Sequence, residues 1–208
     1  MRELSLENYH HYCAEFLQAL ADRFEGTPHG PIFREQRLKY DLAITHSSGA
    51  AKAEKKESLV AAFYQQMQPK FAAVNEGNLE AILDVPFVQD LGLGAAIQES
   101  DPDTRLAIKD YLCSMIQAAV MWSVYRNIPN KLLDTIGSTA ASFGKDGAAQ
   151  DIGDLSKSIL EGIDQNDIQQ FALNMAKNPS ALSDLCTLAS GAGAAINATK
   201  ATAPKALD

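Results

Sequence analysis

The chain has 208 residues, and its 46% hydrophobic content is enough for one sizeable core and a small appendage. A net charge of −8 and a pI near 5.0 argue against a general nucleic-acid binder, because backbone binding needs clustered lysine and arginine. The one basic cluster, Lys52, Lys55 and Lys56, is interrupted by Glu54 and Glu57, and we interpret it as a solvated helix start.

Cys13, Cys113 and Cys186 stand far apart and form no C-x-x-C motif. Neither a disulfide framework nor a zinc knuckle is therefore indicated, and reduced, mostly buried thiols are expected. The N-terminal sequence MRELSLENYHHYC lacks the uninterrupted apolar region and the cleavage site of a signal peptide. These features predict an intracellular, reducing location.

The first helix is predicted between residues 4 and 24, where apolar side chains recur at steps of three and four. This stripe consists of Leu6, Tyr9, Cys13, Phe16, Leu17, Leu20 and Phe24. A turn rich in glycine and proline follows at residues 26–31. A second helix is expected at residues 32–44, with Phe33, Leu38 and Leu42 among its buried residues.

The third helix is predicted to start in the charged segment 51–57, continue through residues 59–67 and break or kink at Pro69. A short helix around Leu79, Ile82 and Leu83 should end at Pro86. An apolar connector made of Phe87, Val88, Leu91 and Leu93 is expected after it. Period-two alternation is rare along the chain, so few or no strands are expected.

The segment Asp101–Asn127 is predicted to form the central helix of the fold. Ser100 is the expected cap, Pro102 lies near the first helical position, and Pro129 should end the helix. Its polar side chains form only a thin stripe, Asp110–Ser114–Gln117, and such a helix must be surrounded by other helices or by lipid. The uncharged part is nearer to 15 residues than to the roughly 20 that span a bilayer. The sequence therefore predicts an all-α fold, an irregular multi-helix bundle around a buried central helix, without a transmembrane segment.

The expected domain organisation follows from these elements. A bundle of residues 1–143 is built on the central helix 102–126, and its last predicted helix spans residues 130–143. Short helices at 152–163, 168–177 and 181–188 form a unit, residues 144–189, packed on or beside the bundle. Residues 190–208 are low in complexity and carry little apolar area, so we expect an extended C-terminal arm that only a partner orders.

Each group of residues that could form a functional site is better explained by an ordinary structural role. His10, His11 and Cys13 are potential metal ligands, but adjacent histidines point about 100° apart on a helix, so we interpret them as partly exposed helix residues. The glycines near Gly92 and Gly191 follow no predicted strand, and Gly144-Lys145 continues into Asp146, so no nucleotide loop is indicated. Asp101 and Asp103 are expected to be helix-start charges. We therefore predict no catalytic, cofactor or metal site and no enzyme activity.

Aromatic and thioether side chains gather on the central helix. They are Trp122, Tyr111, Tyr125, Met115 and Met121. Such a cluster indicates either core or, if it is partly exposed, a patch that docks a partner.

The order of several motifs resembles that of small helical proteins encoded by large nucleocytoplasmic DNA viruses of algae and protists. The motifs are Phe16-Leu17-Gln18-Ala19-Leu20, Phe63-Tyr64, Ile82-Leu83 up to Leu93, and Asp103-Thr104 up to Tyr111-Leu112. The resemblance covers residues 16–122 and implies a virion or assembly component, with no functional residues to carry over.

Two functions are open at this point. The first is a structural or interaction protein, such as a minor capsid or scaffold component, that contacts other proteins through apolar patches and terminal arms. The second is an intracellular binding or regulatory module with a small-molecule or peptide groove beside the central helix. Fold class alone does not choose between them.

Overall fold

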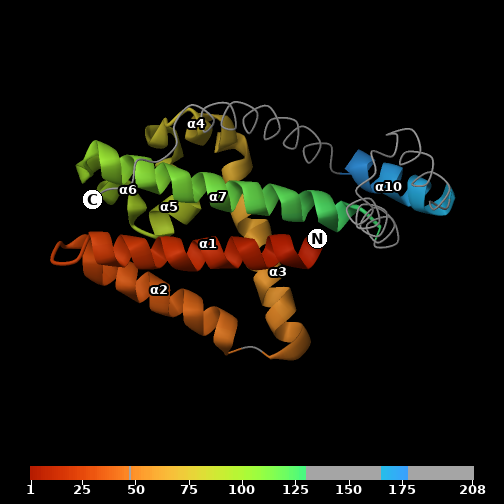
Figure 1. The fold of residues 1–208 in the computed structure, drawn as a ribbon, viewed down its shortest axis with the longest axis horizontal. Coiled ribbons are helices and arrows are strands. Elements are labelled where there is room, and N and C mark those ends of the chain that lie inside the picture. The colour runs from red at the N-terminus through yellow and green to blue at the C-terminus, as the bar shows by residue number, and fades with distance from the viewer. Residues whose placement is uncertain (47, 130–164, 178–208) are drawn as a thin grey trace, which may run out of the picture.

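The computed structural model describes residues 1–46, 48–129 and 165–177, and every regular element within them is helical (Figure 1). The predicted all-α fold is thereby confirmed. The α-helices are α1 (Arg2–Arg23), α2 (His29–Thr45), α3 (Gly49–Met67), α4 (Phe71–Asn75), α5 (Pro86–Asp90), α6 (Leu93–Glu99), α7 (Pro102–Asn127) and α10 (Gln165–Lys177). Two short 3-10 helices, η1 (Gln68–Lys70) and η2 (Leu79–Ile82), join them.

Helix α1 lies between α7 and α2 and packs against both. Figure 1 shows α1 and α7 side by side and antiparallel, so that the N-terminus of the chain lies near the end of α7. All seven members of the predicted apolar stripe are buried, from Leu6 to Phe24. The stripe therefore buries one face of α1, and the side chains outside it are left to form other surfaces.

Helix α7 is the central element that the sequence predicts. Eleven of its residues are buried, more than in α1, and Leu112, Met115 and Ile116 are at most 1% exposed. The predicted polar stripe is also found, because Asp110 and Gln117 are exposed and Ser114 is half-buried. Among the described helices, none combines the length and the apolar content that a bilayer-spanning segment needs.

The cap of α7 differs from the prediction by one residue. Asp101, not Ser100, accepts the backbone N–H of Thr104, at 2.8 Å. The hydroxyl of Ser100 donates instead to the carbonyl of Ala96 in the last turn of α6, at 2.5 Å, so it is not free to cap. Pro102 is the first helical residue as predicted. At the other end Ile128 is extended before Pro129, which also agrees with the prediction.

Helix α2 corrects two expectations. It begins at His29 rather than at residue 32, and Gly30 allows this because a Cβ there would lie 2.5 Å from the carbonyl oxygen of Phe24. Phe33 is fully buried as predicted, but Leu38 and Leu42 are 59% and 43% exposed. Helix α2 packs mainly against α1, so only one of its faces is covered.

The segment between α3 and α7 is more helical than predicted. Pro69 interrupts α3 as expected, and η1 and α4 continue the chain beyond it. Pro86 follows η2, and it is also the first residue of α5. At the first position of a helix the missing N–H of proline costs nothing. The expected connector, with Val88, Leu91 and Leu93 buried, consists of α5 and α6.

The C-terminal third is described only in part. Helix α10 confirms the helix predicted at residues 168–177 and starts three residues earlier. The helices predicted at 130–143, 152–163 and 181–188, the boundary at residue 144 and the arm 190–208 lie outside the described residues.

Candidate functional site

A groove runs along the seam between α1 and α7 and consists of two hollows in line. The first, of about 330 Å³, is lined by Phe16, Ala19, Leu20, Arg23, Asp103, Thr104, Ala107, Ile108 and Tyr111. The second, of about 270 Å³, is lined by Met1, Leu4, Ser5, Asn8, Tyr12, Ser114, Gln117, Ala118, Met121 and Tyr125. We call the two hollows together the α1–α7 groove. It lies directly beside the central helix.

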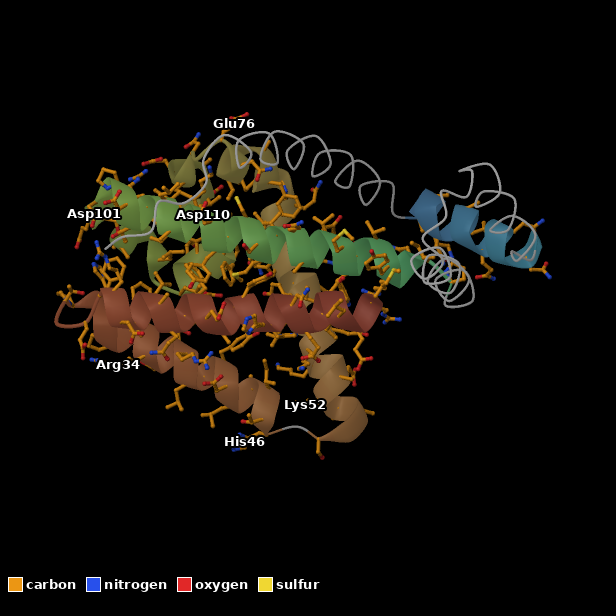
Figure 2. All side chains as sticks on the ribbon, viewed as in Figure 1. Arg34, His46, Lys52, Glu76, Asp101 and Asp110 are labelled. Carbon is orange, nitrogen blue, oxygen red and sulfur yellow. The ribbon has the colours of Figure 1, made fainter. Side chains whose placement is uncertain are left out.

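An ionic network closes the first end of the groove, where α1 ends and α7 begins. Arg23 donates through Nη2 to Asp101 and through Nε to the hydroxyl of Thr104, both at 2.8 Å. That hydroxyl donates to Asp101 at 2.8 Å. The backbone N–H and hydroxyl of Thr104, followed by Arg23, hold the pKa of Asp101 well below its usual range. Figure 2 shows Asp101 at this end of α7. The network joins the two walls of the groove at this end.

The aromatic and thioether cluster of α7 is divided between core and groove. Trp122 and Met115 are buried, as a core cluster would be. Tyr111, Met121 and Tyr125 are half-buried and line the groove. The sequence left open whether the cluster is core or a surface patch, and each alternative describes part of it.

The rim of the groove is acidic. Asp103 lines the first hollow and is exposed. Asp110 is also exposed and lies on α7, three residues after Ala107 and four before Ser114 (Figure 2). Neither carboxylate forms an ion pair with a described residue, whereas the charge of Arg23 is paired with Asp101. The groove therefore presents an apolar, aromatic floor under uncompensated negative charge.

A second polar cluster lies on the other side of α1, toward α2 and α3. The ring of His10 is hydrogen bonded through Nε2 to the backbone carbonyl of Lys56, at 3.1 Å, and through Nδ1 to the hydroxyl of Tyr40, at 2.5 Å. Because a carbonyl only accepts, Nε2 carries the proton and Tyr40 donates to Nδ1. The Tyr40 hydroxyl also lies 3.5 Å from the backbone carbonyl oxygen of His10. The cluster joins three helices through side chains that are far apart in the sequence.

The chemistry of this cluster is structural. Burial lowers the pKa of His10 from 6.5 to about 4, so the ring is neutral at physiological pH. Burial also raises the pKa of the Cys13 thiol to about 12, which leaves almost no thiolate to act as a nucleophile or metal ligand. The expectation of partly exposed residues is wrong for His10 and Cys13, which are 5% and 3% exposed. It is right for His11, which is exposed and pairs with Glu15.

The remaining residues considered in the sequence have local roles. Gly92, with φ of 68°, precedes the first residue of α6 in a left-handed conformation that glycine adopts readily, and it contributes to no phosphate loop. Lys56 pairs with Glu7 at 2.6 Å, while Lys55 is exposed. In the part of the chain that the structure describes, no three side chains of metal-ligand type converge. Gly144, Lys145 and Gly191 lie outside it.

Sequence reasoning misses the α1 wall of the groove and the partner of His10. Leu4, Asn8, Tyr12 and Ala19 recur at helical spacing and form a second, weaker stripe on α1, so the sequence carries a signal for that wall. The sequence contains no comparable signal for Tyr40, because its position beside His10 depends on how α2 folds back on α1.

The chain matches no known protein family, no curated protein and no solved structure. Its own surfaces are therefore the basis on which its function can be inferred.

Proposed function

We propose that this protein is a non-catalytic interaction protein, and that its α1–α7 groove binds a basic amphipathic helix of a partner protein. The observation that carries the proposal is the row of half-buried aromatic and apolar side chains along the seam. Tyr12 on one wall and Tyr111, Met121 and Tyr125 on the other are the anchors of this row. Partly exposed tyrosines and methionines are typical of surfaces that bind other proteins.

The shape of the groove favours a helix over a compact ligand. Residues 103–111 of α7 line the first hollow and residues 114–125 the second. The centres of these segments are about 12 residues apart, or roughly 18 Å along the helix axis. A partner helix can fill both hollows with apolar side chains that recur every three to four residues over three to four turns. A small molecule would occupy only one of them.

The charges favour a basic partner. Asp103 and Asp110 are exposed on α7 and form no ion pair with a described residue, and the chain as a whole carries a net charge of −8. Positive side chains flanking the apolar face of a partner helix would meet this rim, which accelerates encounter and selects orientation. Binding should accordingly weaken as ionic strength rises.

A designed peptide tests the proposal without a known partner. The probe is a fluorescent leucine–lysine helix of about 18 residues, roughly 27 Å long, with leucines at helical spacing. Fluorescence anisotropy with the full chain should show saturable binding to this peptide. A leucine–glutamate helix of the same pattern should bind at least about tenfold more weakly, a difference of about 1.4 kcal/mol.

Matched variants locate the binding. Ala107→Trp fills the first hollow and should weaken binding, whereas Ala62→Trp, at an exposed position of α3, should not. Leu4→Asn and Leu38→Asn form a second pair, because the two leucines are 63% and 59% exposed and only Leu4 lines the groove. Equal effects within each pair, or equal binding of both peptides, would contradict the proposal.

The resemblance to viral helical proteins supports a more specific form of the proposal, in which the partner is another protein of an assembling virion. On this proposal a virus encodes the chain, and mass spectrometry of its purified particles would detect the chain at a constant ratio to capsid protein. A chain found in infected cells but not in particles would contradict this form and leave the groove proposal standing.

A further inference from the structure

A third hollow, of about 500 Å³, lies where α3, α7 and α10 meet. Its lining differs from that of the α1–α7 groove because it is rich in hydrogen-bonding and cationic groups. Trp122, Arg126 and Asn127 come from α7, Gln65 from α3 and Lys177 from α10. A volume of this size is in the range of small-molecule sites.

One wall of this hollow holds an unsatisfied buried donor. Trp122 is 2% exposed, and its indole Nε1 finds no hydrogen-bond acceptor among the described residues. A buried donor without a partner costs about 1–3 kcal/mol, and most buried polar groups in proteins avoid this cost. An acceptor on a bound molecule would satisfy the indole N–H.

The charged side chains that line the hollow are both positive. Arg126 lies over the ring of Trp122, with its Cζ atom 5.2 Å from the ring centroid, a cation–π arrangement that holds the guanidinium beside the indole. No carboxylate of the described residues lines the hollow or pairs with Arg126 or Lys177. The C-terminal end of a helix carries partial negative charge, which explains the presence of Arg126 in the last turn of α7 and of Lys177 in the last turn of α10. The helix dipoles do not explain why the indole N–H of Trp122 has no acceptor among the described residues.

We propose that this hollow binds a small organic carboxylate. The carboxylate oxygens accept hydrogen bonds from the indole N–H of Trp122 and the guanidinium of Arg126, and Lys177 adds positive charge. A carboxylate can accept charge-assisted hydrogen bonds from the cations, and a planar body suits the aromatic walls formed by Trp122 and Tyr64. This site is separate from the α1–α7 groove and does not depend on the function proposed for it.

The chain contains a single tryptophan, so the indole N–H gives one resolved proton–nitrogen NMR signal that reports directly on the site. Titration of the full chain with benzoate should shift this signal saturably. Benzamide, which has the same ring without the charge, and inorganic phosphate should leave it unchanged at the same concentrations. An unmoved indole signal in benzoate, or an equal shift in benzamide, would overturn the proposal, and a larger shift in phosphate would reassign the ligand class and so also overturn it.

Charge variants complete the test and keep the fold intact, because they change exposed residues. Arg126→Gln and Lys177→Gln should each weaken benzoate binding, with Arg126→Gln reducing the affinity at least about tenfold. Arg34→Gln removes another exposed cation, on α2, and should leave the affinity unchanged. Equal affinities for the Arg126 and Arg34 variants would show that benzoate binds elsewhere.

Discussion

The hydroxyl of Tyr40 donates to Nδ1 of His10 over 2.5 Å and joins α2 to α1 across 30 positions of the chain. This hydrogen bond requires a neutral imidazole ring, because a protonated histidine has no acceptor nitrogen. The stability of the packing of α1, α2 and α3 is therefore linked to the protonation of one buried side chain.

Acidification should destabilise the protein before its carboxylates protonate. The folded state keeps His10 neutral down to a pKa of about 4, whereas the unfolded chain protonates it below about 6.5. The contribution of His10 is therefore complete above pH 6.5 and is lost as the pH falls toward 4. Between pH 7 and pH 5 the loss should be about 2 kcal/mol.

Urea denaturation at the two pH values measures this loss. The variant His10→Gln cannot titrate, so its free energy of unfolding should change much less over the same interval. If the wild-type chain and the variant lose stability in parallel, His10 is not the group responsible.

Cys13 should resist modification while the protein is folded. Its thiol is 3% exposed, and burial raises its pKa to about 12. With iodoacetamide at about pH 8, peptide mapping should find Cys113, which is half-buried, alkylated well before Cys13. Urea sufficient to unfold the chain should abolish the difference. Rapid labelling of Cys13 in native buffer would mean that α1 and α2 separate readily.

The cap of α7 should depend on Asp101 and not on Ser100. Asp101→Asn keeps an acceptor for the N–H of Thr104 but loses the charge that faces Arg23, whereas Asp101→Ala loses both. Thermal unfolding followed by circular dichroism should therefore rank wild type above Asp101→Asn, and Asp101→Ala lowest. Ser100→Ala should change the free energy of unfolding by less than about 0.5 kcal/mol. A larger effect at Ser100 than at Asp101 would restore the cap predicted from the sequence.

The interior of α7 should not accept a charge. Ile116 is 1% exposed, so Ile116→Asp buries an unpaired carboxylate and should cost about 3 kcal/mol or more. Gln117→Asp places the same group on the exposed stripe one residue later and should be nearly neutral. Circular dichroism of the two variants makes the comparison, and similar melting curves would mean that α7 is not the buried centre of the fold.

Local patterns in the sequence are sufficient to predict the long helices α1, α2, α3 and α7 and the buried face of α1. Spacing of apolar residues, Pro102 and Pro129 act within a few positions of the chain, so their effects can be read directly from it. The same reasoning located the most buried helix, because a nearly uninterrupted apolar segment has to be surrounded.

Only the tertiary structure decided which helix faces pack against one another and which stay exposed. Leu38 looks like a core residue by spacing, yet it is 59% exposed and none of the described helices covers it, while Tyr40, two residues later, is the partner of His10. Asp101 replaces Ser100 as the cap because α6 already engages the serine hydroxyl and α1 brings Arg23 to the aspartate. Burial depends on segments that are distant in the chain, and a local pattern contains no information about them. For that reason the groove beside α7, with Tyr12 facing it from α1, becomes visible only when the two helices are placed side by side.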